Sequence, residues 1–190
     1  QGIAVTASGQ GNDIRHIVIE DNYIHDIWGQ MGGRGLNVGY YSSAILVRIL
    51  RDRESFRDPS YKPSTINDVR IEGNTIERID KCGIVCWGAR DNVVVRKNRM
   101  DNLGGDGIFV NGPYRGLIEY NVIRRSCLRA GAPDLPGDDG WWPHVAACWI
   151  QDTEETIMQF NEVYDTGRNL YNGDGFAYDF DFNCKRCIAQ

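Results

Sequence analysis

The sequence lacks the features of a membrane-spanning, nucleic-acid-binding or secretion-signal segment. No run of 18 or more apolar residues occurs, so no transmembrane helix is expected. The 26 Asp and Glu outnumber the 21 Lys and Arg, and at a net charge of -5 no basic nucleic-acid surface is expected. The N-terminus has neither the charged nor the apolar region of a signal peptide. Either the protein is cytoplasmic, or its secretion signal is expected to lie outside this piece of chain.

The sequence also has few Cys and His residues at the spacing of a metal site. Cys184 and Cys187 form one CxxC pair, but no second CxxC and no His pair at ligand spacing accompany it. Cys86 and Cys148 fall at inward positions of expected strands, where a small thiol packs in the core. We therefore expect structural cysteines and no metal site built from them.

What remains is an ordinary globular composition. Of the 190 residues, 42% are apolar and 25% are charged, which argues against disorder. The length is typical of one domain with one substantial core. A mildly acidic chain rich in Trp, Tyr, Asp and Asn suits a neutral, hydroxyl-rich ligand.

One strand pattern, apolar-x-apolar-polar-x-Asn-x-apolar, recurs along the chain. Its Asn residues are separated by 52, 24, 23 and 40 positions, namely Asn22, Asn74, Asn98, Asn121 and Asn161. Two separations are close to 24, one is close to twice 24, and one is 24 plus an insertion. A fixed period in the twenties with β-rich units is typical of a stacked solenoid. The Asn residues are then expected to form a ladder between successive turns.

A second strand precedes each Asn pattern, and its alternation defines the expected core. These strands are expected at residues 2–5, 35–38, 83–86, 107–110, 147–150 and 175–178. Because side chains alternate along a strand, the second and fourth residues of each should point inward. Nearly all of those residues are apolar, as a continuous stacked core requires.

This pattern predicts an all-β protein, a right-handed parallel β-helix of about six coils, and it resembles the pectate-lyase-like superfamily over almost the whole chain. A single domain over 1–190 is expected, interrupted by insertions at 42–65 and 128–145. Residues 44–50 within the first insertion suit an extra strand or a short helix. Since the chain starts on a strand and stops inside one, neighbouring coils of a longer solenoid are expected partners.

The outward residues of the first strands are expected to form columns on one open face. The fifth position of each strand yields Thr6, Gly39, Trp87, Asn111, Gln151 and Asp179; the third yields Ala4, Asn37, Val85, Phe109, Trp149 and Ala177. Flat rings stack on sugars and amides bind hydroxyls, so Trp87, Asn111, Trp149 and Gln151 are candidate sugar-binding residues. The alternative is that these outward polar residues are simply solvated.

The last coil carries the candidate catalytic residues. Asp179 and Asp181 are two residues apart on an extended strand, so they should point the same way with Cα atoms roughly 6.5–7 Å apart. Asp152 is expected near them, one coil earlier. Three carboxylates on one face suit glycoside hydrolysis, in which one acts as general acid and another as base or nucleophile. The alternative is that Asp179 and Asp181 only bind turn amides.

Two motifs carry a functional resemblance. The Gly-Asp-Gly-x-Ala-x-Asp-x-Asp stretch at 173–181 is similar to bacterial β-helix glycoside hydrolases. Gly-Asp-Asp-Gly at 137–140 is similar to the paired-Asp motif of polygalacturonases, whose Gly-His-Gly and Arg-x-Lys motifs are absent. The resemblance implies a secreted or periplasmic hydrolase of a polysaccharide or oligosaccharide that needs no organic cofactor.

The insertion at 128–145 is expected to arch over the same face. Trp141, Trp142 and His144 would then wall a sugar subsite, with Asp138 or Asp139 as a further acid. The alternative is that the Trp side chains of this loop pin it to the body of the solenoid.

Two other functions compete with hydrolysis. Several Asp with Gly-Asp-Gly turns suit Ca²⁺, as in β-helix lyases in which the metal holds a uronate carboxylate. Such lyases usually need an Arg or Lys as base, and the expected outward columns contain none. The other competitor is a non-catalytic glycan-binding or structural β-helix, such as a segment of a phage tailspike or an adhesin.

Overall fold

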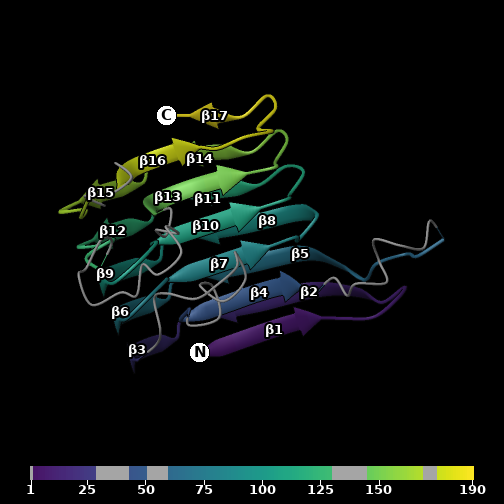
Figure 1. Cartoon of the computed structure of the whole chain (residues 1–190), viewed down its shortest axis with the longest axis horizontal. Coiled ribbons are helices and arrows are strands. Elements are labelled where there is room, and N and C mark those ends of the chain that lie inside the picture. Colours follow the sequence, from purple (N-terminus) through teal and green to yellow (C-terminus); the bar gives the residue numbers. More distant parts are fainter. Residues whose placement is uncertain (1, 29–42, 51–59, 130–144, 169–174) are drawn as a thin grey trace, which may run out of the picture.

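The computed structural model is a parallel β-helix built from three sheets (Figure 1). It describes residues 2–28, 43–50, 60–129, 145–168 and 175–190. Each complete coil contributes one strand to each sheet, and all paired strands are parallel. The described part of the chain contains no helix long and apolar enough to cross a membrane.

Sheet 1 has the order β1-β4-β7-β10-β13-β16. Its strands are β1 (Ile3–Ala7), β4 (Ile45–Ile49), β7 (Ile84–Trp87), β10 (Ile108–Asn111), β13 (Ala146–Gln151) and β16 (Phe176–Phe180). Sheet 2 comprises β2 (Asp13–Glu20), β5 (Thr65–Glu72), β8 (Asp91–Arg96), β11 (Leu117–Glu119), β14 (Ile157–Gln159) and β17 (Ile188–Ala189). Sheet 3 comprises β3 (Tyr23–Ile27), β6 (Thr75–Ile79), β9 (Arg99–Leu103), β12 (Val122–Arg124) and β15 (Glu162–Tyr164).

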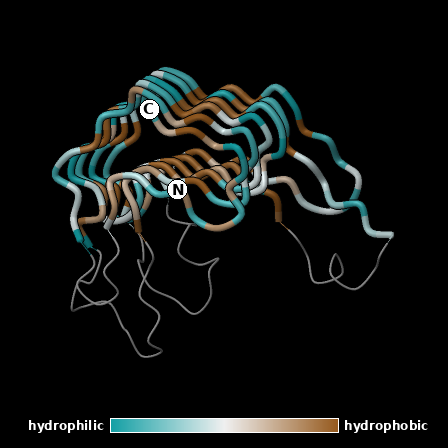
Figure 2. Tube along the Cα trace, turned by 90° about the horizontal axis from the view of Figure 1, so that it is seen from above, coloured by the Kyte–Doolittle hydropathy of each residue, from teal (hydrophilic) through white to brown (hydrophobic). Residues whose placement is uncertain are grey.

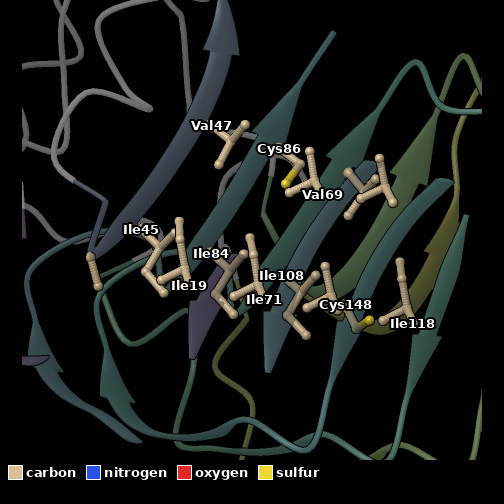
Figure 3. Close-up of a cluster of buried hydrophobic side chains, with 14 of the residues drawn as sticks. Ile19, Ile45, Val47, Val69, Ile71, Ile84, Cys86, Ile108, Ile118 and Cys148 are labelled. Atoms are coloured by element: carbon tan, nitrogen blue, oxygen red, sulfur yellow. The ribbon is translucent and has the colours of Figure 1, made fainter. Parts of the chain in front are cut away.

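The core consists of inward side chains that repeat from coil to coil. Viewed from above, successive coils superpose, and hydrophobic positions recur at the same places (Figure 2). On sheet 1, the predicted inward residues Ile84, Ile108 and Cys148 are fully buried neighbours, and residues of sheet 2 meet them from the other side (Figure 3). Burial raises the pKa of the Cys86 and Cys148 thiols to about 12, so both remain neutral core groups.

The second strand of sheet 1 differs from the sequence prediction. Its place is taken by β4, which pairs Ile45 with Ile3 and Val47 with Val5. The predicted strand at 35–38 lies outside the described residues. Residues 44–50, for which an extra strand or a short helix was expected, form the strand β4 of the regular stack. Residues 35–38 and residues 44–50 are both apolar enough to supply this strand, and the alternation of side chains along the sequence does not distinguish them.

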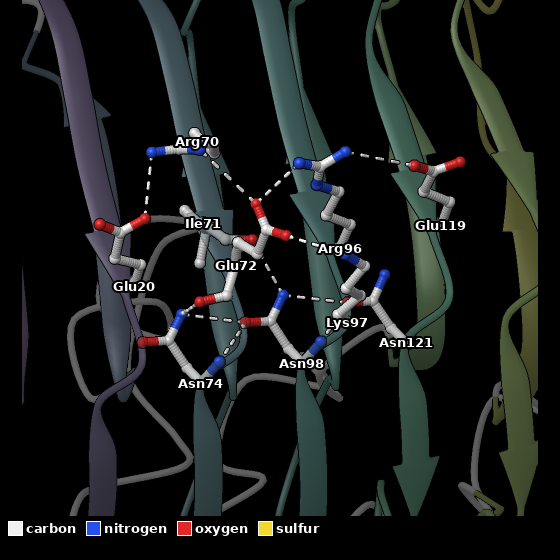
Figure 4. A network of polar contacts seen from close by, with 10 residues as sticks. All are labelled: Glu20, Arg70, Ile71, Glu72, Asn74, Arg96, Lys97, Asn98, Glu119 and Asn121. Carbon is white, nitrogen blue, oxygen red and sulfur yellow. Dashed lines mark hydrogen bonds and ion pairs between the residues drawn. The ribbon is translucent and has the colours of Figure 1, made fainter.

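The predicted Asn ladder is confirmed at the corner between sheets 2 and 3. Asn98 Oδ1 accepts hydrogen bonds from the backbone N and the Nδ2 of Asn74, at 3.0 and 2.9 Å. Asn98 Nδ2 donates to Ile71 O and to Asn121 Oδ1, both at 3.0 Å (Figure 4). Asn74, Asn98 and Asn121 are fully buried, and each satisfies polar groups of two coils.

The backbone before each Asn is left-handed. The preceding residues have φ values from 52° to 69°, and they are Asp21, Gly73, Lys97, Tyr120 and Phe160. Four of these five residues are not glycine, and a residue with a side chain adopts the left-handed conformation only at a cost in free energy. Because every coil turns here in the same way, the hydrogen bonds of the Asn ladder offset that cost at each turn.

A charge ladder crosses the outer side of sheet 2 beside the Asn ladder. Glu72 binds Arg96 at 2.9 Å and Lys97 at 3.2 Å, and Arg70 binds Glu20 at 3.0 Å (Figure 4). Opposite charges on neighbouring strands favour this register, although each exposed pair contributes only about 0.2–1 kcal/mol.

Replacement of the buried Asn98 by Ala tests the ladder. We expect Asn98→Ala to lower the free energy of unfolding by on the order of 3 kcal/mol, because it leaves the backbone N of Asn74 and O of Ile71 without those partners. The measurement is urea unfolding followed by circular dichroism. The control is Asn22→Ala at the half-exposed first rung, where Asn22 N still donates to Asn74 Oδ1. Equal losses in the two variants would contradict the role given to the buried rungs.

Candidate functional site

Two columns of side chains point away from the core on sheet 1, and the strand register defines them. The first outward column is Ala4, Leu46, Val85, Phe109, Trp149 and Asp179. The second outward column is Thr6, Arg48, Trp87, Asn111 and Gln151. Asp181 follows β16 directly and donates its backbone N–H to Ile150 O at 3.0 Å, beside Gln151.

The position of Asp179 corrects the predicted register of the last coil. Asp179 pairs with Trp149, whereas the repeat pattern of the sequence predicts Gln151 as its neighbour. The displacement is two residues, so Asp179 remains on the same side of sheet 1 as Asn111, as alternation requires. The error arose because β13 starts earlier than expected, with Ala146 opposite Phe176.

The aromatic residues of the first outward column are buried, which corrects the prediction of an open stacking platform. Phe109 is 1% exposed and Trp149 is 5% exposed. Their rings stack with centroids 3.9 Å apart and planes at 15°, and Trp87 meets Phe109 edge-on at 6.0 Å. Trp87 alone among these three rings is half-buried. We call these three packed rings, Trp87, Phe109 and Trp149, the aromatic floor, and Asp179 is next in the first outward column.

Amide and carboxylate groups meet at the C-terminal ends of β10, β13 and β16. Asn111 Nδ2 donates to Asp152 Oδ2 at 3.1 Å and approaches Gln151 Oε1 at 3.5 Å. Asn183 Nδ2 donates to Asp152 Oδ1 at 2.8 Å. The exposed Asp152 carboxylate is thus held between amides of the preceding and the following coil.

Asp152 occupies a position that suits glycine. It follows β13 with a φ of 51°, and the equivalent residues after β7 and β10 are Gly88 (φ 83°) and Gly112 (φ 94°). In each coil the backbone N of this residue donates to the next coil. An Asp at a left-handed position where two other coils have Gly indicates a special role for its carboxylate. The repeat pattern of the sequence contains this signal, but the sequence analysis did not use it.

The turn after β16 is one residue longer than its neighbour. Ile150 pairs with Phe180 and Glu154 with Lys185, so four steps in one coil correspond to five in the next. Asp181 lies in this turn, half-buried, and its Oδ1 accepts a hydrogen bond from Phe182 N at 2.8 Å. The longer turn places Asn183 beside Asp152, whereas the Asp181 carboxylate binds an amide of its own turn.

Arg48 corrects another expectation, the absence of a cation in the outward columns. It stands between Thr6 and Trp87 in the second outward column, half-buried, with Nε 3.5 Å from Thr6 Oγ1. The prediction failed because β4 replaced the expected strand at 35–38.

A buried polar group lies near the other end of the aromatic floor. Burial raises the pKa of Asp106 to about 6, while the nearby Ala146 N–H and the Lys81 ammonium oppose that rise. Burial also lowers the pKa of Lys81 and raises that of the Cys82 thiol. Sequence reasoning missed Asp106 because an Asp-Gly pair before a strand resembles a turn.

Three predicted subsite residues, Asp139, Trp142 and His144, lie outside the described residues. Within the ranges that the structure describes, no group of three or more His, Cys, Asp or Glu is arranged to hold a metal ion. The described chemistry of the face is therefore that of carboxylates, amides, an aromatic floor and one guanidinium.

The chain belongs to the right-handed β-helix family, since the model of the right-handed β-helix region matches residues 1–184. The predicted fold is thereby confirmed. The chain is 27% identical over 209 residues to lacto-N-biosidase of Bifidobacterium longum subsp. longum, an alignment that covers 95% of this chain and 13% of that protein.

Solved structures show the same fold. Two crystal structures of the GH136 lacto-N-biosidase from Eubacterium ramulus, the native protein and its selenomethionine derivative, align with TM-scores of 0.71 and 0.74 at 18% identity. They cover 100% and 98% of this chain. The chain spans 32% of each solved structure and about an eighth of the curated relative.

Two substitutions of Asp152 test its backbone conformation. Both Asp152→Gly and Asp152→Ala remove the carboxylate, but only Ala retains a Cβ at a left-handed residue. We expect the Ala variant to unfold about 1 kcal/mol more easily than the Gly variant. The two are compared by denaturant unfolding. An Ala variant as stable as the Gly variant would show that this turn is not held left-handed.

The buried Asp106 makes stability depend on pH. Its pKa is about 6 in the folded chain and near 3.8 when solvated, so the folded state binds the proton more tightly. This contribution is fully present below pH 4 and is lost as pH rises through 6. We expect the free energy of unfolding of the parent, relative to Asp106→Asn, to fall by about 2 kcal/mol between pH 4 and pH 7. Parallel curves for the two proteins across this window, measured by urea unfolding, would contradict the burial of an ionisable carboxyl.

Proposed function

We propose that this chain contributes the catalytic face of a glycoside hydrolase. The proposal rests on the placement of Asp179 on β16, of Asp181 directly after it and of Asp152 directly after the paired strand β13. Asp152 also binds the amides of Asn111 and Asn183. Similarity to lacto-N-biosidases from two bacteria supports the proposal, because the name of those proteins denotes a glycosidase.

The proposed chemistry uses a pair of carboxyl groups and water, without an organic cofactor. One member of the pair Asp179 and Asp181 protonates the oxygen of the departing sugar. The other either attacks the anomeric carbon as nucleophile or, as base, takes a proton from the water that attacks this carbon. Asp152 accepts amide hydrogen bonds on both oxygens, so we assign it to orienting substrate and neighbouring side chains. The amides of Asn111 and Gln151 bind sugar hydroxyls.

The proposed substrate is an oligosaccharide or polysaccharide met outside the cytoplasm. Because the relatives are lacto-N-biosidases, glycans that contain lacto-N-biose are the first substrates to test. Plant and algal polysaccharides form the second panel. Asp139, Trp142 and His144 remain proposed as walls of a sugar subsite.

A calcium-dependent lyase is the second candidate, and Arg48 is the observation that favours it. A cation in the second outward column supplies the type of base that such lyases use. Release of unsaturated products, abolished by EDTA and restored by Ca²⁺, would establish the lyase instead of the hydrolase.

Separate replacements of the two strand carboxylates test the hydrolase. We expect Asp179→Asn and Asp181→Asn each to lower kcat by about 10²–10⁴-fold on the best glycan, because each removes a proton-transfer or nucleophilic group. Reducing-end release is measured for the full-length protein that contains this chain.

The matched control is Asp165→Asn, an exposed carboxylate on the far side of the solenoid, after β15. It should retain parental activity. Unchanged hydrolysis in both strand variants would remove these residues as catalysts. A parent that binds glycans but cleaves none would instead be a binding module.

A further inference from the structure

The last described coil carries the one CxxC pair of the sequence, at the corner between sheet 1 and sheet 2. Cys184 and Cys187 enclose Lys185 and Arg186, both exposed, in the turn that leads from β16 to β17. Both cysteines are half-buried free thiols, and both pack against the main hydrophobic core. The two thiols therefore lie on the inner side of the turn, whereas the side chains between them face solvent.

The two preceding coils contain the same turn. Its second residues are aligned by β-bridges between neighbouring coils, and they are Tyr114, Glu154 and Lys185. Its third residues all have a left-handed backbone, with φ values from 52° to 60°, and they are Arg115, Glu155 and Arg186. In the two later turns, the second residue donates its N–H to the first residue of the turn before, at 3.0 and 2.9 Å. One conformation thus repeats in the turns 113–116, 153–156 and 184–187.

The first and fourth side chains of this turn meet in both preceding coils. Thr153 and Thr156 are buried, and their hydroxyls form a hydrogen bond with each other. In the coil before, a Cβ added to Gly116 would lie 3.3 Å from Cγ of Pro113. A disulfide joins two Cβ atoms that are roughly 3.5–4.5 Å apart. Cysteines at the first and fourth positions of this turn therefore stand close enough to be joined.

The contacts of the two thiols agree with this arrangement. Cys187 Sγ lies 3.7 Å from Thr153 O, the carbonyl that also accepts the N–H of Lys185, and 3.3 Å from Lys185 O. Cys184 Sγ lies 3.5 Å from Ile150 O. The Cys187 side chain is thus folded back over the residue that follows Cys184.

We propose that Cys184 and Cys187 form a disulfide in an oxidising compartment, and that this bond holds Asn183 against Asp152. Asn183 directly precedes Cys184, and its Nδ2 donates to Asp152 Oδ1 at 2.8 Å. A covalent link across the turn removes conformations in which Asn183 leaves this contact. The effect on activity rests on the proposed function, because Asp152 belongs to the candidate site. Formation of the disulfide does not depend on that function.

A small disulfide such as oxidised glutathione is the oxidant. The Cys187 thiolate attacks one sulfur of the small disulfide, so that a mixed disulfide forms and one small thiolate leaves. Cys184 then loses its proton and attacks Cys187 Sγ, which releases the second small thiolate. Two protein thiols are thereby oxidised, the small disulfide is reduced to two thiols, and the two protons pass to these thiols.

Burial determines the order of the two attacks. It raises the pKa of the Cys184 thiol to about 11, and the neighbouring Cys187 adds to the rise. A thiol that retains its proton is a weak nucleophile, so we assign the first attack to Cys187. A thiol with a high pKa is also a poor leaving group, so a disulfide that includes Cys184 resists reduction. The pair is therefore suited to a structural disulfide and not to a catalytic CxxC.

Peptide mapping of the full-length protein that contains this chain tests the disulfide. The folded protein is oxidised with oxidised glutathione, its remaining thiols are blocked with N-ethylmaleimide in denaturant, and it is digested with trypsin, which cleaves after Lys185 and Arg186. We expect most of the peptide 169–185 to remain joined to the peptide that begins at Cys187, and dithiothreitol to separate the two. Maleimide or glutathione on both cysteines in most molecules would overturn the proposal.

The matched control moves one thiol by one residue. Cys187→Ser combined with Ile188→Cys places the second thiol on the opposite, outer side of β17, where Ile188 is exposed. We expect about 10-fold less linked peptide than in the parent, because the two Cβ atoms then point apart. Equal linkage in the two proteins would remove the geometry of the turn as the basis of the bond.

The kinetic arm compares the oxidised and the reduced parent on the best glycan. We expect reduction to lower kcat/KM by about 10-fold, because Asp152 then loses a fixed partner. The double variant Cys184→Ser and Cys187→Ser should show the lower value in both states. In Asn183→Ala, kcat/KM should not depend on the redox state, because the contact through which the disulfide acts is absent. A redox effect of parental size in Asn183→Ala would overturn the coupling to Asp152.

The two proposals fail separately. A parent that forms the linked peptide but cleaves no glycan would remove the proposed hydrolase and keep the disulfide. Hydrolysis that depends on Asp179, in a parent that forms no linked peptide, would keep the hydrolase and remove the disulfide.

Discussion

The buried Asn ladder is the interaction on which the register of the solenoid depends. Each interior Asn bonds the Asn of the next coil and a backbone carbonyl of the previous one, so a shift by one residue would break bonds in two coils. A slipped strand would also turn its inward residues outward. The ladder stands beside a left-handed corner that non-glycine residues adopt only when their surroundings enforce it. Register, in turn, decides which outward side chains become neighbours.

That register explains why the candidate site lies at the C-terminal edge of sheet 1. Stacked coils place equivalent outward residues side by side, so small changes in successive coils accumulate at one location. Gly gives way to Asp152, the next turn gains one residue, and Asp179 follows two stacked aromatic rings. None of these changes disturbs the inward columns, because alternation separates the two faces of a strand. The scaffold can therefore vary its chemistry without loss of its core.

Sequence reasoning recovered what strict periodicity determines and lost what depends on contacts between coils. The ladder and the inward residues Ile84, Ile108 and Cys148 followed from spacing alone. The second coil was misplaced because two apolar segments fitted equally, and only pairing with Ile3 selects Ile45. Alternation also identified Phe109 and Trp149 as outward but could not show that this outer side is buried. Burial of this outer side depends on which parts of the chain pack against it, and a local sequence pattern does not contain that information.

Burial of the outer side has a chemical consequence for the proposed site. Phe109 and Trp149 of the aromatic floor are packed away from water, and a carboxyl near the end of that floor is correspondingly difficult to hydrate. Asp106 shows this, since its carboxyl retains a proton to a pH near 6. Carboxylates at the rim, such as Asp152, instead contact amides and solvent. The face thus has a dry interior around Phe109 and Trp149 and a polar rim at Asp152, so carboxyl groups of this chain stand in two different environments, which favour opposite protonation states.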